Sequence, residues 1–430
     1  MRFEKTEGDR QKLGEQEHAE MLLVAKALEE NPGVTFDARD TRAEQLFARS
    51  EKRKTLSRRL KITPVDQERL MAARQGFATR RLDLAAVSSL IDGPIRPRPG
   101  DVVLARVDRL RYHRRIELPN GRKANLHTGD EIIVAYGNRY ATDQYEGVVP
   151  FDLAKTNLIA TGGVAATMLG RNSAMRSATD ITPIGLLGNE RGDPINLRDL
   201  VERGDFPTTP RPQTIAILGT SMNSGKTTVC KSLIRGLRAA GKRVAGLKIT
   251  GTGSGGDYWA MVDAGAQVVA DFTDAGYPST YKVALQELEQ ILLELLALAT
   301  RHQVDVAVIE IADGIYQAQN MALMASPTFQ EAIDRVVFAA GDSLGAAQGL
   351  RYLQEASLPV VAVSGRLTMS ELSVRETSGV CDLPILSRRE LESPFFATTQ
   401  VLEAEIQTPP TDGLSGVGGD GPSVFKWAER

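Results

Sequence analysis

The chain has 430 residues, a formal net charge of −2 and a hydrophobic content of 42%. This length favours about two or three domains, and the near-neutral charge argues against a general affinity for nucleic acid or anionic membranes. No apolar run approaches the roughly 18 residues that a membrane-spanning helix requires. Because residues 1–20 are charged throughout and only two cysteines are present, we expect a cytoplasmic protein without a secretory signal.

The first half of the chain changes its pattern near a proline-rich linker. Residues 1–93 are rich in charge and carry apolar residues at helical spacing, for example over 66–81, which predicts a helical N-terminal segment. The basic stretch 49–61 is compatible with a nucleic-acid-binding arm, but we prefer a solvated helical cap or dimerisation segment. Residues 98–205 show short runs of period two and are expected to form a small β-rich domain, with one helix over 158–169.

The second half alternates between apolar runs and helical stretches. The apolar runs lack polar alternation, which is typical of parallel strands covered on both faces. Residues 213–390 are therefore predicted to form a doubly wound α/β domain with a mainly parallel sheet. Residues 405–430 contain few apolar side chains and are predicted to be a mobile tail. The expected strands cover residues 214–218, 243–249, 304–311, 335–340 and 360–364.

The strongest functional signal is a P-loop pattern in residues 215–228. A buried strand leads into a loop of small residues, and the loop opens a helix. Backbone N–H groups in such a loop surround triphosphate oxygens, Lys226 brings a positive charge, and the Thr227 hydroxyl suits Mg²⁺. We expect ATP with Mg²⁺ here, since no GTP-recognition motif Asn-Lys-x-Asp follows a late strand. The residues expected to hold the nucleotide are Thr220, Ser221, Met222, Asn223, Ser224, Gly225, Lys226, Thr227 and Thr228.

A second signal lies where the next strand ends, in residues 246–257. The carboxyl ends of parallel strands face the same crevice as the phosphate loop. We therefore expect Lys248 near the γ-phosphate, with Thr250 and Gly251 helping to bind a small substrate. Asp257 is expected to hold Mg²⁺ or one of its waters. The alternative is that the glycine-rich stretch is a plain flexible loop and that Lys248 is a solvated strand end.

A third signal closes the strand of residues 304–311. Glu310 and Asp313 stand where a Mg²⁺-bound triphosphate needs a carboxylate opposite the loop. Glu310 is the first choice for the metal, and Asp313 either contacts the substrate or caps a helix that starts near Gly314. The predicted catalytic residues are Lys226, Lys248 and Glu310, and the predicted metal ligands are Thr227, Asp257 and Glu310.

Together these segments resemble dethiobiotin synthetase and its relatives, the cobyrinic acid amide synthases. That family has a loop of the form Gly-Thr-x-x-x-x-Gly-Lys-Thr, matched here from Gly219 to Thr227, and a second-strand lysine matched by Lys248. A closer resemblance, over roughly residues 150–370, is to a P-loop family of unknown function. One member of that family takes part in D-glutamate N-acetylation, and the likeness is clearest in residues 262–272.

The resemblance implies an ATP-dependent ligase-like enzyme that activates a small carboxylate or carbamate by γ-phosphoryl transfer. Two alternatives stay open. One is an acyltransferase that acts on an amino acid, and the other is a nucleotide-gated chaperone or regulatory ATPase. A small-molecule substrate is expected in the first two cases. Relatives of this kind are often dimers, so the resemblance also implies a homo-oligomer. The near-neutral charge makes a membrane partner unexpected and disfavours a nucleic-acid partner.

Overall fold

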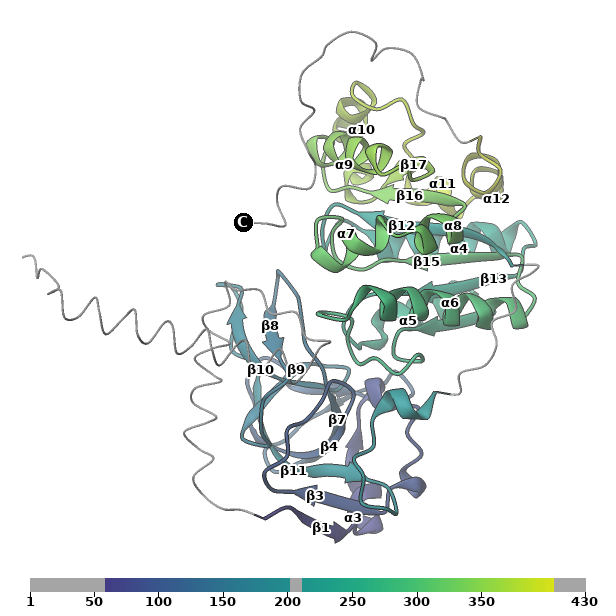
Figure 1. Cartoon of the computed structure of the whole chain (residues 1–430). Coiled ribbons are helices and arrows are strands. Elements are labelled where there is room, and N and C mark those ends of the chain that lie inside the picture. Colours follow the sequence, from purple (N-terminus) through teal and green to yellow (C-terminus); the bar gives the residue numbers. More distant parts are fainter. Residues whose placement is uncertain (1–58, 202–210, 406–430) are drawn as a thin grey trace, which may run out of the picture. The chain divides into compact units, whose positions relative to one another are not determined.

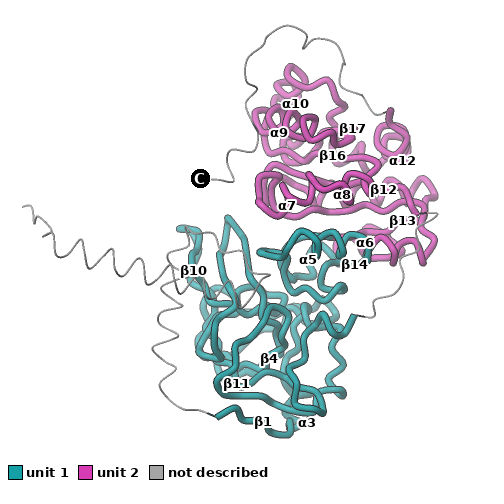
Figure 2. Tube along the Cα trace, in the orientation of Figure 1, with its two compact units in different colours: residues 1–206, 249–259, 270–295 teal, residues 207–248, 260–269, 296–430 magenta. Residues whose placement is uncertain are grey.

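The computed structural model describes residues 59–201 and 211–405. It divides into two compact units, each discontinuous in sequence (Figure 2). Of the described residues, unit 1 comprises 59–201, 249–259 and 270–295, and unit 2 comprises 211–248, 260–269 and 296–405. No helix in the described part of the chain is both long and apolar enough to cross a membrane.

Unit 1 is built on a nine-stranded sheet in which five strands close into a ring (Figure 1). Its path runs β1-β3-β11-β4-β7-β10-β8, and β9 pairs with both β10 and β11, so the ring is β11-β4-β7-β10-β9. Alternate residues such as Val103, Ala105 and Val107 of β4 point to one core, as the period of two requires. The strands are β1 (Lys61–Pro64), β2 (Arg74–Gln75), β3 (Ser89–Asp92), β4 (Val102–Arg109), β7 (Glu131–Tyr136), β8 (Tyr145–Val148), β9 (Thr156–Ala160), β10 (Val164–Arg171) and β11 (Thr179–Gly188). A separate hairpin is formed by β5 (Arg115–Glu117) and β6 (Lys123–Asn125).

The helix expected over residues 66–81 is short. Helix α3 covers only Gln67–Ala72, and β2 follows it directly. The reason is tertiary pairing: β2 joins β7, and the backbone N–H of Gly76 donates to the carbonyl oxygen of Ile133 at 2.9 Å. Because β1 and β3 also join this sheet, residues 59–93 belong to the β-rich fold rather than to a helical segment. Residues 1–58, which hold most of the predicted helical segment and its basic stretch, lie outside the described residues.

The helix expected over residues 158–169 is absent, and the structure has the β9–β10 hairpin there instead. Gly163 turns the chain at φ 96°, and Val164 then pairs with Ala160. The apolar residues here are buried on both faces of the sheet, and such a run cannot be told from a buried helix by its periodicity. The pair Gly162-Gly163 was therefore the only local sign of a turn in this stretch.

Unit 2 contains a six-stranded sheet in the order β14-β13-β15-β12-β16-β17, and the recorded registers are parallel. The five strands expected in this half are confirmed, and the short β14 was missed. The strands are β12 (Gln213–Gly219), β13 (Val244–Lys248), β14 (Val268–Asp271), β15 (Val306–Glu310), β16 (Arg335–Ala339) and β17 (Val360–Ser364). Its apolar core includes Ile215, Val229, Leu233 and Val308.

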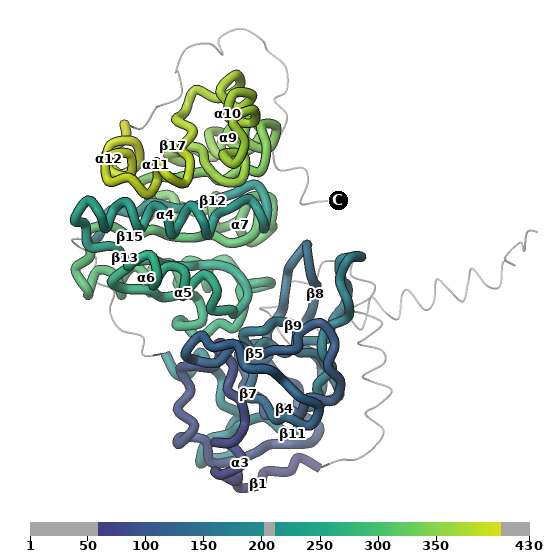
Figure 3. Tube along the Cα trace, turned by 180° about the vertical axis from the view of Figure 1, so that it is seen from behind, coloured from purple at the N-terminus to yellow at the C-terminus, as the bar shows by residue number. Residues whose placement is uncertain are grey.

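Helices cover both faces of this sheet, as a doubly wound fold requires. Figure 1 shows α7 and α8 in front of the sheet, and the view from behind in Figure 3 shows α4 before it. The helices of the second half are α4 (Lys226–Ala239), α5 (Gly255–Asp263), α6 (Leu285–Arg301), α7 (Ala318–Met324), α8 (Pro327–Ala332), α9 (Ser343–Glu355), α10 (Glu371–Ser378), α11 (Arg388–Glu392) and α12 (Pro394–Phe396). The expected fold class, a mainly parallel α/β domain preceded by a β-rich domain, is confirmed.

The extent of the P-loop domain also differs from the expected range of residues 213–390. Residues 249–259 and 270–295 were expected in the P-loop domain, but they pack with the β-rich unit. Close backbone contact explains this, because a Cβ added to Gly276 would lie 2.7 Å from the Cα of Arg198. Glu117 of β5 likewise accepts a hydrogen bond from the backbone N–H of Gly255 at 2.8 Å.

Candidate functional site

The phosphate loop of unit 2 links the buried strand β12 to helix α4. Gly225 precedes the helix with φ 104° and ψ 12°, a left-handed conformation that glycine adopts without strain. Because glycine has no side chain, Gly225 does not cap the first N–H groups of α4. An anion bound at this helix start would meet those donors and the positive end of the helix dipole. The start of α4 therefore has a glycine in the left-handed conformation and no side-chain cap, as the prediction of a phosphate loop requires.

Three predicted residues lie together at the start of α4. Lys226 is 3% exposed, and its ammonium group donates to the carbonyl oxygen of Ser221 at 2.7 Å. The Thr227 hydroxyl donates to the Glu310 carboxylate at 3.1 Å, and Glu310 is 2% exposed. Buried charges are costly unless other groups compensate them, so this arrangement points to a function for the lysine and the carboxylate.

Lys248 adds a second buried cation next to this group. It is the last residue of β13 and lies opposite Glu310 in the parallel register of β13 and β15. Its exposed fraction is 8%, so the alternative of a solvated strand end does not hold. Lys248 and Glu310 thus lie side by side at the carboxyl ends of neighbouring strands, where ligands bind in open α/β sheets.

A magnesium ion fits the chemistry of the Thr227 and Glu310 oxygens. The two oxygen atoms are 3.1 Å apart, and a hydroxyl with a carboxylate is a donor pair that Mg²⁺ accepts beside phosphate and water. Within the described ranges no group of three or more histidine, cysteine, aspartate or glutamate side chains forms a metal cluster.

The segment after β15 lies against the phosphate loop. A Cβ added to Gly314 would come within 2.6 Å of the carbonyl oxygen of Thr220, so only glycine allows this approach. Asp313 takes a left-handed φ of 63°, an uncommon conformation for a residue with a side chain. Asn320 fixes the turn by donating to the carbonyl oxygens of Ala312 at 2.6 Å and Gly314 at 3.1 Å.

Asp313 does not cap the next helix. Helix α7 begins at Ala318, and the Gln317 side chain accepts the N–H of Asn320 at 2.9 Å, so Gln317 is the cap. The alternative role considered for Asp313 is therefore wrong, because the helix starts four residues later than Gly314 suggested. Its place in a strained turn beside the phosphate loop keeps the substrate-contact role as a prediction.

Two residues that follow β17 also support the loop, and the sequence reasoning missed them. The backbone N–H of Arg366 donates to the carbonyl oxygen of Ser224 at 2.9 Å. Gly365 has φ 100°, and a Cβ there would lie 2.6 Å from the same carbonyl oxygen. A Gly-Arg pair directly after a late parallel strand was the available signal.

The other predicted residues, Thr250, Gly251 and Asp257, belong to unit 1. Thr280 donates its backbone N–H to the carbonyl oxygen of Gly251 at 2.9 Å and accepts the Gly251 N–H on its hydroxyl at 2.8 Å. Asp257 lies in the first turn of α5, whose start is held by Glu117 through the Gly255 N–H. The glycine-rich stretch is therefore a fixed element of unit 1 and not a plain flexible loop.

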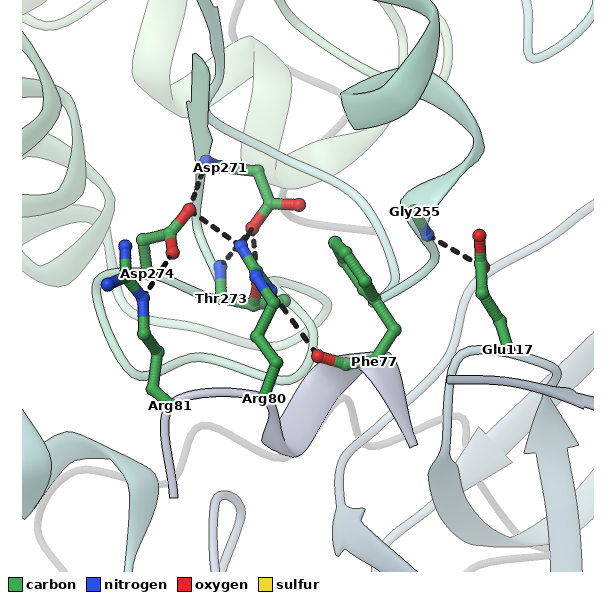
Figure 4. A network of polar contacts seen from close by, with 8 residues as sticks. All are labelled: Phe77, Arg80, Arg81, Glu117, Gly255, Asp271, Thr273 and Asp274. Atoms are coloured by element: carbon green, nitrogen blue, oxygen red, sulfur yellow. Dashed lines mark hydrogen bonds and ion pairs between the residues drawn. The ribbon is translucent and has the colours of Figure 1, made fainter. Parts of the chain in front are cut away.

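A buried ion-pair network in unit 1 was also missed (Figure 4). The Arg80 guanidinium contacts Asp274 at 2.7 Å and Asp271 at 3.4 Å, and Arg81 contacts Asp274 at 2.7 Å. Burial raises the pKa of Asp271, while the charge of Arg80 opposes that rise. The Asp271 carboxylate also accepts a hydrogen bond from the backbone N–H of Thr273 at 2.8 Å. Since both carboxylates are held by arginines, the network fixes the turn after β14 rather than offering a reactive group.

Comparisons with known proteins give only distant structural likenesses. No family model matches the chain, and no curated protein matches it. Among solved structures, the signal recognition particle receptor FtsY from Elizabethkingia anophelis is 15% identical, with 45% of this chain and 68% of that chain covered and a TM-score of 0.30. The 54 kDa signal recognition particle protein from Aeropyrum pernix K1, in complex with GDP, is 15% identical over 47% of this chain and 48% of its own, with a TM-score of 0.30.

The cell division protein FtsY from Thermotoga maritima gives a similar result, with 15% identity, 46% of this chain and 69% of that chain covered and a TM-score of 0.31. The chain thus spans only about half the length of the Aeropyrum protein. Likenesses of this size say nothing about activity. The P-loop fold of unit 2 rests on its own sheet order, its glycine-capped loop and the buried Lys226.

Proposed function

We propose that the chain is a Mg²⁺-dependent, ATP-binding enzyme of the ligase-like kind, which transfers the γ-phosphoryl group of ATP to a small carboxylate or carbamate. The observation that carries the proposal is the cluster at the strand ends. The Thr227 hydroxyl lies 3.1 Å from Glu310, and Lys248 stands opposite Glu310 on the next strand. Lys226 starts the helix beside them.

Each of these groups has a task in phosphoryl transfer. Lys226 and the N–H groups of α4 would hold the β- and γ-phosphates, and Thr227 with Glu310 would hold Mg²⁺ directly or through water. Lys248 would neutralise charge on the γ-phosphoryl oxygens as they part from ADP. Because positioning and charge stabilisation account for most of this catalysis, no nucleophilic side chain is required.

The reaction is balanced without any further reactant in its first step. A carboxylate oxygen of the substrate attacks the γ-phosphorus, and the bond from that phosphorus to the bridging oxygen breaks. The electron pair of that bond leaves with ADP, and an acyl phosphate forms. An amine then attacks the acyl carbon, inorganic phosphate departs, and the amine loses a proton to solvent.

The first test measures ADP release by the purified full-length chain with ATP, Mg²⁺ and a panel of small carboxylic acids. Lys226→Ala should lower acid-stimulated turnover at least about a hundredfold, since one charge-stabilising donor is worth about that much. Lys231→Ala on the same helix is the matched control and should retain turnover, because Lys231 is partly exposed and lies about 1.4 turns further along α4. Equal turnover in wild type and Lys226→Ala would refute the site.

The second test addresses the chemistry. Hydroxylamine added to the reaction should trap the acyl phosphate as a hydroxamate, in an amount that matches ADP. Release of CoA from acetyl-CoA that requires an amino-acid acceptor and no ATP, measured without hydroxylamine, would instead favour the acyltransferase alternative. ATP hydrolysis that no acid or amine changes, but that a protein partner stimulates, would favour the regulatory ATPase.

A further inference from the structure

Unit 1 contains a pocket that the proposed function does not use. Its volume is about 510 Å³, and it lies between the loop that follows β4 and the loop that follows β10. Half of its ten lining residues are arginines, and none of the ten is acidic. The arginines are Arg109, Arg111, Arg114, Arg171 and Arg176, and the other lining residues are Leu110, Ser173, Ala174, Met175 and Ser177.

Most of this positive charge is not neutralised by the surrounding structure. Arg111 is the exception, because both its Nε and its Nη2 lie 3.1 Å from a carboxylate oxygen of Asp180. Asp180 also has Lys155 at 3.8 Å, so one carboxylate faces two cations. Over residues 59–201 and 211–405 the other four lining arginines form no ion pair with a carboxylate. The pocket therefore has a net positive charge.

Backbone contacts hold the first loop of the pocket in place. The N–H of Arg111 donates to the hydroxyl of Thr179 at 3.0 Å, and that hydroxyl donates to the carbonyl oxygen of His113 at 2.6 Å. The N–H of Tyr112 donates to the carbonyl oxygen of Ser177 at 3.2 Å, which ties the first loop to the second. The arginine stems thus leave fixed backbone positions, and only their outer ends need to be ordered by a ligand.

The second loop is fixed as well. Asn172 donates its side-chain N–H to the carbonyl oxygen of Thr142 at 3.1 Å and accepts the N–H of Ala174 at 3.0 Å. The Tyr145 hydroxyl donates to the carbonyl oxygen of Arg176 at 2.5 Å, and the ring of Tyr145 is buried. A loop with this many contacts is pre-organised, which lowers the entropic cost of binding a ligand.

We propose that this pocket binds a small organic molecule that carries two or more phosphate groups. Guanidinium groups bind phosphate oxygens with two parallel hydrogen bonds, and several of them together suit a ligand with several negative charges. A volume of about 510 Å³ lies within the range of small-molecule sites. Met175 and Leu110 offer apolar contact to the carbon part of the ligand, and the two lining serines offer hydroxyl groups.

The proposal does not depend on the proposed enzymatic function, because every lining residue lies in unit 1. A phosphate ligand would nevertheless bind to a working phosphate loop too. The binding experiments therefore use the full chain with Lys226→Ala, in which any binding at the loop is weakened. If the phosphate loop binds no nucleotide, the Lys226→Ala change has no effect on the pocket measurement. Each of the two proposals can therefore be refuted without refuting the other.

The experiment titrates inorganic diphosphate into this background chain by calorimetry. Arg114→Ser combined with Arg176→Ser should weaken binding at least about tenfold, since charge-assisted hydrogen bonds are lost. Arg115→Ser is the matched control, because Arg115 neighbours Arg114, is exposed and is not among the lining residues. Arg114→Lys should give a smaller loss, since it keeps the charge but not the paired hydrogen bonds.

Four outcomes would overturn the proposal. The first is that the background chain binds no diphosphate. The second is that Arg115→Ser weakens binding as much as the double variant does. A tricarboxylate such as citrate binds at least as tightly as diphosphate and is lost with the same arginines, which would make this a carboxylate site. A single-stranded oligonucleotide binds more tightly than either and competes with diphosphate, which would make it a nucleic-acid surface. Unchanged circular dichroism and thermal unfolding of each variant confirm that losses arise at the pocket.

Discussion

Unit 2 surrounds its candidate nucleotide site with buried groups, whereas unit 1 lines its pocket with arginines that reach solvent. Lys226 is 3% exposed, while the Arg111 side chain is 33% exposed even though it is paired with Asp180. In unit 2 backbone N–H groups and the helix start supply fixed dipoles, so geometry selects the ligand. In unit 1 the selection comes from the charges at the ends of long side chains, which are more easily screened by salt. The two proposed anion sites therefore differ in their expected sensitivity to mutation and to salt.

The largest effect is expected for Gly225→Ala, which attacks the backbone part of the unit 2 site. A Cβ at Gly225 would lie 3.2 Å from the backbone nitrogen of Arg366 at a φ of 104°, so the loop must move. A displacement of about 1 Å at such a site costs roughly a hundredfold in turnover. ATP binding by equilibrium dialysis and ADP release measure the loss.

Gly241→Ala is the matched control for that variant. Gly241 also has a positive φ, of 81°, but no atom lies within 4 Å of the added Cβ. The change should lower stability by about 1 kcal/mol through the left-handed conformation and leave ATP turnover as it was. If Gly241→Ala reduced turnover as much as Gly225→Ala, backbone strain in general would explain both results and the loop would lose its special role.

The next effect is an expected loss of stability of unit 1 at acidic pH. Burial, together with the charge of Arg139, lowers the pKa of His113 in unit 1 to about 4, below its ordinary value of 6.5. Between pH 6.5 and about 4 the His113 side chain is therefore neutral in the folded state but protonated in the unfolded chain. The stability that this neutral histidine provides is present above pH 6.5 and is lost as the pH falls from 6.5 toward about 4. The full loss is about 3 kcal/mol, since each pKa unit corresponds to about 1.4 kcal/mol.

Hydrogen exchange of peptides from each unit, measured at pH 7 and pH 4.5 with correction for intrinsic rates, would detect this loss. The protection of β9 and β10 in unit 1 should fall at the lower pH, and His113→Gln should reduce that pH dependence. His127→Gln is the control, because His127 is exposed in the same unit. An unchanged pH dependence in His113→Gln would show that other groups cause the acid sensitivity.

The sequence predicted the unit 2 site better than any feature of unit 1, and the reason lies in sequence distance. Gly225, Lys226 and Thr227 are neighbours in the chain, so their helix start is visible in the local pattern. The pairing of Lys248 with Glu310 also follows, because parallel strand ends meet at one edge of a sheet. The structure places these residues as expected, and their chemical roles stay predictions.

The arginine pocket could not be found in the same way. Arg109 and Arg171 end two strands that are distant in sequence, and their loops meet only because β9 pairs with both β10 and β11 while β11 pairs with β4. The strands β9 and β10, which close this ring, were not predicted, because residues 158–169 have the apolar pattern of a helix. Tertiary pairing also turned residues 59–93 into strands of the same sheet. Local patterns cannot predict a site whose register depends on such distant pairings.

The smallest effect is expected from salt, and it tests the comparison directly. Raising the salt concentration from about 50 to about 200 mM shortens the screening length to less than about 10 Å, which weakens interactions of exposed charges more than those of buried ones. Diphosphate affinity at the unit 1 pocket should therefore fall several-fold in the Lys226→Ala background. ATP affinity in a chain with Arg114→Ser and Arg176→Ser, where only the unit 2 site is intact, should fall less. Both series are measured by calorimetry with the same monovalent salt and a fixed Mg²⁺ concentration. A steeper salt dependence of ATP affinity at unit 2 would contradict this distinction between the two sites. It would mean that exposed side-chain charges dominate binding at the phosphate loop, rather than fixed backbone dipoles and a buried lysine.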